Sequence, residues 1–421
     1  MSTVASGAAA TGSASDVLAA LQSRGFVQQC SNLEGLRQQL GEQKVTFYYG
    51  IDPTGDSLHA GHLVGLLAMA HLQAAGHRPI LLIGGGTARV GDPTDKDKMR
   101  QLLPVERVAA NAARITEQVG RFIDLDNTTI VNNADWLAPL HYLDFLREIG
   151  RHFSVNRMLG FEAYKRRLAT GLSFLEFNYL LLQAYDFLIL NQRHGCLLQI
   201  GGDDQWANIL SGIDLVRRVE AVESYALTWP LVTMADGSKM GKTTAGAVFL
   251  DAERIAPYEF YQYWVNVPDA DVGTLLPLLT MLPHEQIADL AKLRDRDAAK
   301  AKGVLAFELT QLVHGSAAAG SARDATRSLF SGEGADREAL PSATLPRTDL
   351  EAGIPLAVLF ARTPLCSSNS DARRLIQQGG AAINGAIRDR VDATVGVADI
   401  ADGELLLRAG KKRYFRLVVE P

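Results

Sequence analysis

Two histidines, His59 and His62, stand three positions apart in the stretch IDPTGDSLHAGH, residues 51–62. This spacing places both imidazoles on one face of a helix that begins there. Such a pair could bind a metal, act as an acid–base pair or bind phosphate. A helix N-terminus attracts anions, and Gly61 would let a flat ring approach the backbone. Zinc peptidase helices need histidines four apart with a glutamate, which this stretch lacks. Two surface histidines at a helix start are the competing interpretation.

A second candidate is the apolar helix predicted for EFNYLLLQAYDFLIL, residues 176–190. Its polar members Tyr179, Gln183 and Asp186 fall at i, i+4 and i+7, along one stripe. A polar stripe usually faces solvent. Here, however, apolar residues occupy most other directions around the helix, and burying an amide and a carboxylate is costly unless they find partners. The pattern therefore favours a ligand pocket.

The stretch KMGKT, residues 239–243, places Lys239, Lys242 and Thr243 in a short loop after Asp-Gly-Ser. Two lysines three apart among small residues could close over a polyphosphate, although a solvated surface loop has the same composition. The loop is not a P-loop, because Asp236 stands where the first glycine of that motif would be. GGGTARVG likewise lacks the glycine spacing of a dinucleotide-binding fingerprint.

Short apolar runs at residues 45–51, 79–84, 129–132 and 196–201 predict buried strands, and a helix is predicted from about residue 59 to 75. Strands that alternate with helices predict a parallel sheet with both faces covered. Ligands bind at the carboxyl ends of such strands. The stretches IDPTG, GGGTARVGD and GGDDQ all follow predicted strands, so we expect them to form one site.

Composition bounds the possible functions. The 421 residues carry a net charge of −5, and 47% of them are hydrophobic. These values are typical of a globular protein and argue against a nucleic-acid-binding surface spread over the whole molecule. No apolar run has the length of a transmembrane helix, and the three cysteines are too far apart to suggest a metal site or a disulfide framework, which fits the cytoplasm.

The chain is predicted to fold in several parts. Small polar residues make 1–15 a flexible extension, and 16–250 carry the strand–helix alternation of an α/β domain. Residues 251–330 have a helical period, and 331–353 have the glycine and proline content of a linker. Residues 354–421 carry ten Lys/Arg against seven Asp/Glu, a net charge of +3.

The last part is predicted to be a small basic α+β unit. Its helix precedes a strand and an Asn384–Gly385 turn that is typical of a hairpin. Basic residues on such a unit suit an RNA backbone, whereas an accessory domain with a solvated basic face is the alternative. The residues expected to contact RNA are Arg373, Arg374, Lys411, Lys412 and Arg413.

Together these segments resemble the bacterial tyrosyl-tRNA synthetases, which are class I aminoacyl-tRNA synthetases, from about Leu18 to the end of the chain. HAGH is similar to the HIGH motif of that class, and KMGKT is similar to its KMSKS motif. FYYGIDPT, GDPT, YLLLQAYD and IGGDDQW resemble the family in order and spacing. The resemblance implies a Rossmann-like parallel-sheet catalytic domain with an insert at about 120–165, a helical domain and a small α+β S4-like RNA-binding domain.

The resemblance also implies a reaction. The carboxylate of L-tyrosine attacks the α-phosphate of ATP, which gives tyrosyl-adenylate and pyrophosphate, and the tyrosyl group then passes to the 3′ end of tRNA(Tyr). ATP enters as a substrate with Mg²⁺, and no tightly bound protein metal is expected. The enzyme is expected to be a cytoplasmic homodimer without a membrane association, with the insert at the dimer interface.

The site residues implied by the resemblance fall into three further groups. The expected catalytic groups, which donate to phosphate rather than shuttle protons, are Thr54, His59, His62, Lys239, Lys242 and Thr243. Tyrosine is expected to be bound by Tyr48, Thr87, Asp92, Tyr179, Gln183 and Asp186, of which Tyr48 and Asp186 meet the phenol oxygen. ATP or the adenylate is expected to be bound by Asp52, Gly61, Gly202, Asp204, Gln205 and Lys242. Tyr49, where the family usually carries a smaller residue, and Asp203 depart from the pattern.

Two other functions compete with this one. A tryptophanyl relative would have an indole pocket and no S4-like tail, so the Tyr48–Asp186 pair and the basic tail disfavour it. An RNA-binding protein that retains a synthetase body would have no need of the histidine pair or of Lys239 and Lys242.

Overall fold

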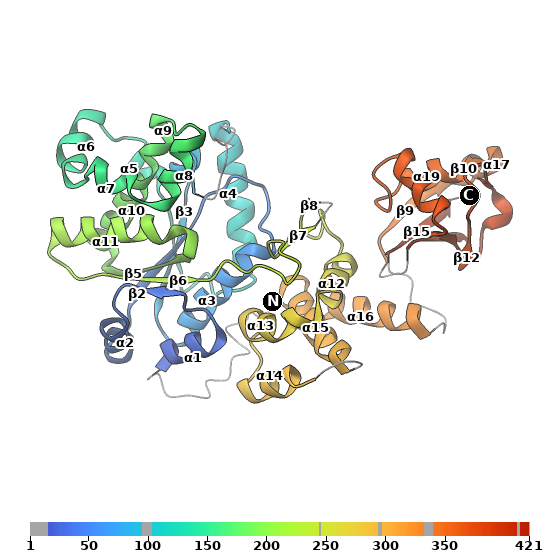
Figure 1. The fold of residues 1–421 in the computed structure, drawn as a ribbon, viewed down its shortest axis with the longest axis horizontal. Coiled ribbons are helices and arrows are strands. Elements are labelled where there is room, and N and C mark those ends of the chain that lie inside the picture. Colours follow the sequence, from blue (N-terminus) through green and yellow to red (C-terminus); the bar gives the residue numbers. More distant parts are fainter. Residues whose placement is uncertain are drawn as a thin grey trace. The chain divides into compact units, whose positions relative to one another are not determined.

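The computed structural model describes residues 16–94, 103–243, 246–293, 297–331, 340–410 and 413–420 (Figure 1). The expected extension at residues 1–15, Lys411, Lys412 and the side chain of Thr243 lie outside the described part. The chain divides into two compact units. The first comprises the residues up to Ile255 with Trp264–Val313, and the second comprises Ala256–Tyr263 with the residues from His314 onward.

A six-stranded sheet in the order β1-β6-β5-β2-β3-β4 organises the first unit. All neighbouring strands run parallel except β1 and β6, which are antiparallel. The four predicted strands are confirmed, and the structure adds β1 and β6. The strands are β1 (Gln29–Cys30), β2 (Thr46–Ile51), β3 (Arg78–Ile83), β4 (Thr129–Asn132), β5 (Cys196–Gly202) and β6 (Tyr225–Trp229).

Helices cover both faces of this sheet (Figure 1). One face carries α10 (Tyr179–His194) and α11 (Trp206–Glu220), and the other carries α1 (Val17–Arg24) and α3 (Leu63–Ala74). The predicted helix from residue 59 is confirmed, with a 3₁₀ turn, η3 (Ala60–His62), in front of α3. The chain leaves β2 toward β3 and leaves β5 toward β6, so the strand order reverses between β2 and β5. Ligands of open α/β sheets bind at that reversal point.

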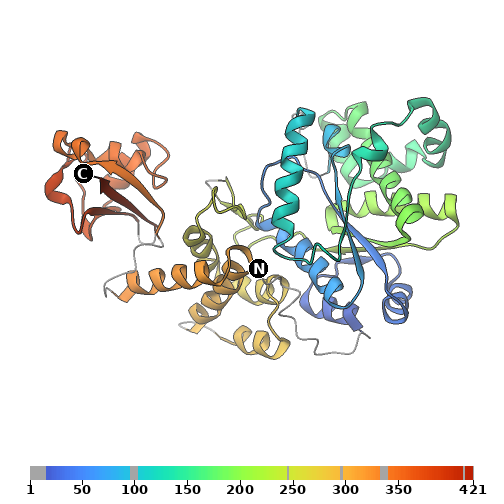
Figure 2. The ribbon, with the colours of Figure 1, turned by 180° about the vertical axis from the view of Figure 1, so that it is seen from behind.

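Helix α4 (Val105–Val119) lies beside the β3–β4 edge, as Figure 2 shows from behind. The predicted insert after β4 is helical, with α5 (Ala134–Leu137), α6 (Tyr142–Glu148), α7 (Val155–Leu159) and α8 (Glu162–Thr170), and α9 (Phe174–Phe177) leads into α10. Arg167 and Glu176 join α8 to α9 by a bidentate ion pair of 2.7 and 2.9 Å whose side chains are each 3% exposed. This pair fixes the entry of α10, where Tyr179 begins the polar stripe.

A helical domain was predicted for residues 251–330, and the described part of this range is mainly helical but is divided between the two units. The first unit contains α13 (Asp269–Leu279), α14 (His284–Ala291) and most of α15 (Ala298–His314). Arg24 of α1 fastens the end of α13 by donating to the carbonyl oxygens of Pro277, Thr280 and Leu282 at 3.3, 2.9 and 2.6 Å. Most of α12 (Pro257–Val265) and α16 (Ser316–Ser331) belong to the second unit.

The second unit also contains a five-stranded sheet in the order β12-β11-β14-β15-β9, whose core is closed by α18 (Leu356–Ala361) and α19 (Asn369–Gln377). The hairpin predicted at Asn384–Gly385 is confirmed, because β11 and β12 pair around that turn and both residues have positive φ angles of 47° and 85°. The strands are β9 (Ser342–Pro346), β11 (Ala381–Ile383), β12 (Ala386–Ile387), β14 (Glu404–Ala409) and β15 (Arg413–Glu420). A further pair joins β10 (Ile354–Pro355) to β13 (Thr394–Val395).

The prediction of a linker over 331–353 is wrong for its second half. Strand β9 pairs in parallel with β15, and α17 (Arg347–Ala352) follows it. Leu345 and Leu350 are buried in the same core as α18 and α19. Burying these two leucines gives the segment a fixed place in the small sheet, so the domain begins about a dozen residues earlier than predicted.

Candidate active site

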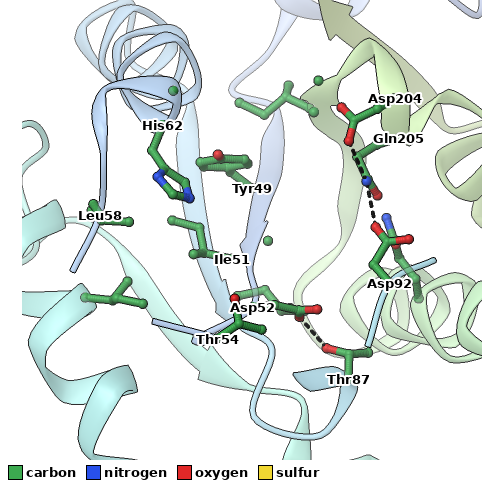
Figure 3. Close-up of a pocket in the computed structure, with 18 of the residues that line it drawn as sticks. Tyr49, Ile51, Asp52, Thr54, Leu58, His62, Thr87, Asp92, Asp204 and Gln205 are labelled. Carbon is green, nitrogen blue, oxygen red and sulfur yellow. Dashed lines mark hydrogen bonds between the residues drawn. The ribbon is translucent and has the colours of Figure 1, made fainter. Parts of the chain in front are cut away.

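A cavity of about 460 Å³ opens at the carboxyl ends of β2 and β5 (Figure 3). Most of its lining comes from the end of β2 with the histidine turn (residues 59–62), the turn after β3, helix α10 and the turn after β5. Further lining residues are Ile115, Trp229, Leu231 and Phe249. The structure thus brings together most of the predicted site. The predicted residues that line the cavity are Tyr48, Asp52, Thr54, His59, Gly61, His62, Thr87, Asp92, Tyr179, Gln183, Asp186, Gly202, Asp204 and Gln205.

The histidine turn is a capping box. Gly61 N donates to His59 Nδ1 at 3.1 Å, and His59 N donates to His62 Nδ1 at 3.1 Å. Nδ1 of His62 thus accepts from His59 N and also lies 3.3 Å from the His59 carbonyl oxygen, and the shorter contact to the N–H favours the tautomer with its proton on Nε2. Desolvation, with His59 nearby, lowers the pKa of His62 to about 3. His62 is therefore a neutral hydrogen-bond donor, which does not suit a proton shuttle at neutral pH.

The closed end of the cavity is lined by Tyr48 and Asp186. Asp186 is 2% exposed and accepts from Asn133 Nδ2 at 2.9 Å and Trp136 Nε1 at 2.7 Å. Burial raises the pKa of Asp186 to about 8, the two hydrogen bonds oppose that rise, and Asp52 adds to it. The Tyr48 hydroxyl is buried and has no hydrogen-bond partner among the described residues. An acceptor and an unpaired hydroxyl thus face the same space, which suits a phenol.

Asn133 and Trp136 were not predicted from the sequence. Both follow β4 in the stretch VNNADWL and reach Asp186 across about 50 residues of chain. The available signal was their position, since polar residues directly after a predicted strand lie at the ligand edge of a parallel sheet.

Carboxylates gather at the middle of the cavity. Asp52 accepts from Tyr179 Oη at 2.9 Å and from Thr87 Oγ1 at 2.7 Å. Asp92 accepts from Gln205 Nε2 at 2.8 Å and from Thr94 N at 2.9 Å. Two carboxylates in a recess favour a positively charged ligand group, as the predicted ammonium site requires.

Gln183 completes this recess from α10. Its Oε1 is buried without a hydrogen-bond partner among the described residues. A buried oxygen of this kind is expected to accept a hydrogen bond from a bound ligand. The stripe predicted on α10 therefore faces a cavity and not solvent.

The turn after β5 forms the far wall, with Gly202 followed by η6 (Asp203–Gln205) (Figure 3). A Cβ on Gly202 would lie 2.4 Å from Asp204 Oδ1, so a side chain at position 202 would displace that carboxylate. Asp203 faces the other way and accepts from Gln29 Nε2 at 2.7 Å and Thr228 Oγ1 at 3.0 Å. Its charge therefore fastens β1 and β6 to the end of β5.

Tyr49 points to the sheet face opposite Tyr48, as alternation along β2 requires. Its ring meets Trp229 edge-on, with centroids 5.3 Å apart. A Cβ on Gly65 of α3 would lie 2.7 Å from Tyr49 Cζ and 2.8 Å from its Oη. The large residue at position 49 is therefore accommodated by the absence of a side chain at position 65. Burial, and secondarily Asp204, raises the pKa of Tyr49.

The lysine loop forms a hairpin, β7 (Lys242–Thr243) and β8 (Gly246–Ala247), whose base lies on the histidine turn. Val248 N donates to Gly241 O at 2.8 Å, and Ala60 N donates to Val248 O at 2.7 Å. Gly241 has a positive φ of 76°, and a Cβ there would lie 2.8 Å from the Ala60 Cβ. Lys239 and Lys242 are exposed and do not line the cavity. The structure thus joins the two motifs through their backbones.

The basic residues of the second unit are less uniform than predicted. Arg373 and Arg374 lie exposed on α19, and Arg374 is 3.5 Å from Asp371. Arg413 donates to the Leu365 carbonyl oxygen at 2.9 Å, so part of its guanidinium has a structural contact.

Comparison with known families shows the family to which the chain belongs. The model of the class I tRNA synthetases for tryptophan and tyrosine matches residues 40–331. The chain belongs to the class I tRNA synthetases. A second family model, the SYY-like C-terminal domain of tyrosine–tRNA ligases, matches residues 337–417 of this synthetase.

Relatives match over nearly the whole synthetase. A tyrosine–tRNA ligase from Treponema denticola is 50% identical over 401 residues, 94% of this chain and 98% of the relative. One from Clostridium botulinum is 49% identical over 407 residues, which cover 96% of this chain and 100% of the relative.

Solved structures agree on the catalytic part. A C-terminally truncated mitochondrial tyrosyl-tRNA synthetase from Aspergillus nidulans superposes with a TM-score of 0.67 and 29% identity, covering 75% of this chain and 94% of that one. A tryptophanyl-tRNA synthetase from Plasmodium falciparum shares the fold at a TM-score of 0.52 and 14% identity, covering 71% of this chain and 84% of that one. The fold alone therefore does not separate the tyrosine and tryptophan branches.

Proposed function

We propose that this synthetase is a tyrosine–tRNA ligase, which activates L-tyrosine with ATP and transfers the tyrosyl group to the 3′ end of tRNA(Tyr). The observation that carries the proposal is the closed end of the cavity, where the buried Tyr48 hydroxyl and the Asp186 side chain face the same space. The phenol hydroxyl of tyrosine can donate to Asp186 and accept from Tyr48. Phenylalanine would leave both groups unpaired in a desolvated recess, which costs binding energy.

The rest of the cavity supports an order of contacts. Asp92, Tyr179 and Gln183 hold the α-ammonium, with Thr87 supporting Asp52 and Tyr179 beside it. The α-carboxylate then points toward the histidine turn. There Thr54, His59 and the neutral Nε2–H of His62 donate to the phosphates of ATP.

No protein nucleophile is needed for this chemistry. The tyrosine carboxylate oxygen forms a bond to the α-phosphorus as the bond to pyrophosphate breaks, so catalysis consists of positioning and of stabilising negative charge on the phosphates. Lys239, Lys242 and Thr243 supply donors from the hairpin when it closes. Asp52, Gly61, Gly202, Asp204 and Gln205 surround the nucleotide and adenylate. Mg²⁺ binds phosphates with few protein ligands, so we propose that it enters as the ATP complex.

We propose that the second unit binds tRNA for the transfer step. The match to the C-terminal domain of tyrosine–tRNA ligases supports this role and disfavours the tryptophanyl alternative. We propose that exposed cations of that domain contact the RNA backbone. They are Arg373, Arg374, Lys411, Lys412 and the exposed part of Arg413. In domain terms, the α/β catalytic region to about residue 250 and the helical region to 330 precede this domain.

We also propose a homodimer. The insert helices and the segment after them expose large apolar side chains that a monomer would not bury, with Leu143 at 77% and Phe174 at 69% exposure. Others in the same region are Tyr142, Val155 and Leu168. Sedimentation velocity of the full chain is expected to give twice the 45.6 kDa chain mass, and a monomer at micromolar concentration would contradict this proposal.

The cellular compartment of the synthetase is inferred from where its substrates are found. No helix among the described residues is long and apolar enough to cross a membrane. We propose the cytoplasm, because ATP, tyrosine and tRNA are present there and translation there consumes the charged tRNA.

Aminoacylation tests the whole proposal. The purified full chain is incubated with ATP, Mg²⁺, labelled amino acid and total bacterial tRNA, and acid-precipitable label is counted. Labelled tyrosine is expected to be incorporated and labelled tryptophan is not. Incorporation of tryptophan alone would support the tryptophanyl alternative instead, and incorporation of neither would favour an RNA-binding protein.

A further inference from the structure

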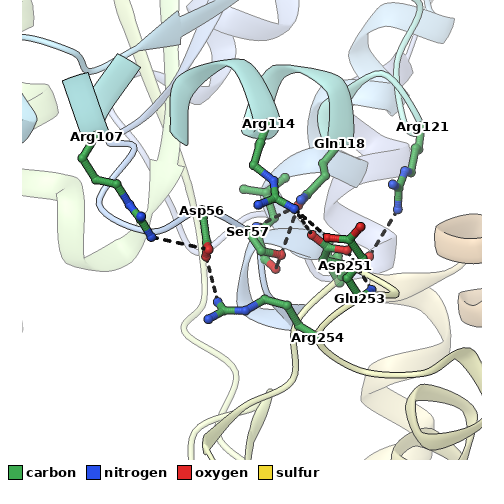
Figure 4. Close-up of polar contacts among 11 residues, drawn as sticks. Asp56, Ser57, Arg107, Arg114, Gln118, Arg121, Asp251, Glu253 and Arg254 are labelled. Carbon is green, nitrogen blue, oxygen red and sulfur yellow. Dashed lines mark hydrogen bonds and ion pairs between the residues drawn. The ribbon is translucent and has the colours of Figure 1, made fainter. Parts of the chain in front are cut away.

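Helix α4 contacts two separate segments that lead to the proposed phosphate donors (Figure 4). One is the loop 53–58, between Asp52 and His59. The other is the segment 250–254, which follows the lysine hairpin. None of the α4 side chains was predicted from the sequence to take part in the site.

Two buried amides of α4 hold the ends of the first segment. Asn111 Nδ2 donates to the Pro53 carbonyl oxygen at 3.0 Å, directly before Thr54. Gln118 Oε1 accepts from Leu58 N at 2.8 Å, directly before His59, and from Ser57 Oγ at 3.3 Å. Asn111 and Gln118 are seven residues apart and thus share one face of α4. Both side chains are buried.

Cations near the C-terminal end of α4 hold the second segment. Arg121 donates to the Leu250 carbonyl oxygen at 3.2 Å. Arg114 donates to Asp251 Oδ2 at 3.3 Å and to Glu253 Oε2 at 2.9 Å. Figure 4 shows these contacts side by side with those of Gln118.

The two segments are also joined to each other. Leu250 N donates to Leu58 O at 2.9 Å, Phe249 forms a β-bridge with His59, and Ala60 N donates to Val248 O at 2.7 Å. Arg254 closes the group with an ion pair of 2.9 Å to Asp56. The histidine turn and the base of the lysine hairpin are therefore one short ladder, and α4 is attached to both of its strands.

We propose that Asn111 and Gln118 of α4 are positioning residues for adenylate formation, which set where Thr54 and His59 meet the phosphates and where the lysine hairpin is hinged. The inference rests on the proposed function of the histidine turn and the hairpin. Neither side chain lines the cavity, so both act through the backbone of residues 53–58. A displacement of about 1 Å at such donors can lower the rate of a reaction that depends on alignment by about 100-fold.

The test compares two substitutions at one position. Gln118→Leu removes the acceptor and keeps similar bulk, whereas Gln118→Glu keeps an oxygen that can accept from Leu58 N and Ser57 Oγ. The measurement is tyrosine-dependent ATP–pyrophosphate exchange, expressed per active site titrated by adenylate formation. Gln118→Leu is expected to lower kcat at least tenfold and to change the KM for tyrosine less than twofold, and Gln118→Glu is expected to restore most of kcat.

The matched control is Glu117→Leu, the exposed neighbour on the same helix, which is expected to keep wild-type kcat. Asn111→Ala releases the other end of the loop and replaces Gln118→Leu if that variant does not fold. In a His59→Ala background, the further loss caused by Gln118→Leu is expected to shrink to less than threefold.

The outcomes separate this inference from the proposed function. Absence of exchange by the wild type, or an unchanged rate in His59→Ala, would overturn the proposed role of the histidine turn as a phosphate donor and this inference with it. If the wild type is active and His59→Ala is impaired, then wild-type kcat in Gln118→Leu, a parallel rise in the KM for tyrosine, or no rescue by Gln118→Glu would overturn the inference alone.

Discussion

At the scale of single residues, the cavity is distinguished by buried polar atoms whose partners the protein does not supply. The Tyr48 hydroxyl and Gln183 Oε1 are both buried without a hydrogen bond among the described residues. Leaving such atoms unpaired destabilises a fold by about 1–3 kcal/mol each. Their presence in one cavity with the buried Asp186 is best explained by a ligand that satisfies them.

Asp186 gives the first prediction. Asp186→Ala removes the acceptor for the substrate phenol and leaves Asn133 and Trp136 without theirs. Leaving buried hydrogen-bonding groups unsatisfied costs about 1–3 kcal/mol, so kcat/KM for tyrosine is expected to fall roughly 5- to 150-fold. The KM for ATP, measured in the same exchange assay, is expected to change little. Equal losses for both substrates would count against a place for Asp186 at the phenol.

The second prediction concerns pH. The pKa of His62 is lowered to about 3, so His62 gains its proton only well below the usual histidine value and stays neutral at pH 5 and above. The kcat/KM for ATP, which reports the free enzyme, is therefore expected to show no ionisation from His62 between pH 6 and 8. Wild type and His62→Asn should give profiles of the same shape. A fall below pH 6.5 that His62→Asn abolishes would contradict this account.

The residues of the site could be predicted from the sequence where they followed a local pattern. The His59–His62 spacing and the stripe on α10 identified groups that line one cavity. Asn133 and Trp136 were missed although they follow a predicted strand, and Gln118 could not be found from the sequence, because a lone polar residue on a helix face carries no periodic signal. Their roles exist only once distant segments have come together.

At the scale of elements, hydrophobic patterning predicted four of the six strands of the large sheet and the helices α3 and α10. It missed β1, which is two residues long, and the interior strand β6, and it placed β9 in a linker. The sequence of β9, SATLP, has one buried leucine and ends in proline, so its strand character comes from pairing with β15 some 70 residues later. Non-local pairing of this kind leaves no mark in a short window.

The lysine hairpin gives the third prediction. Lys242 is exposed and its hairpin is hinged on the histidine turn, so its charge is expected to reach ATP only as the transition state forms. Lys242→Ala is expected to lower the rate of adenylate formation roughly 10- to 150-fold, the effect of losing a charged donor worth about 1.5–3 kcal/mol. Single-turnover kinetics measure this rate, and tyrosine affinity from equilibrium dialysis should stay within twofold. An unchanged rate would show that Lys242 does not contact the phosphates of ATP in the transition state.

At the scale of the whole molecule, activation and tRNA charging are expected to be separable. The two family models meet between residues 331 and 337, and the small sheet that begins at Ser342 has its own core. A chain that ends at Ser331 is expected to retain tyrosine-dependent exchange within a few-fold and to lose detectable charging of tRNA. Aminoacylation and exchange assays on the same preparation measure both activities. Charging at the full-length rate would show that the C-terminal domain does not hold the tRNA.

The central claim is that the cavity between β2 and β5 activates tyrosine, and ATP–pyrophosphate exchange tests it most directly. The purified full chain with ATP and Mg²⁺ is given labelled pyrophosphate and one amino acid at a time. Label is expected to enter ATP with tyrosine and to remain at background with tryptophan, with phenylalanine and without an amino acid. Exchange that depends on tryptophan, or no exchange with tyrosine, would contradict the account.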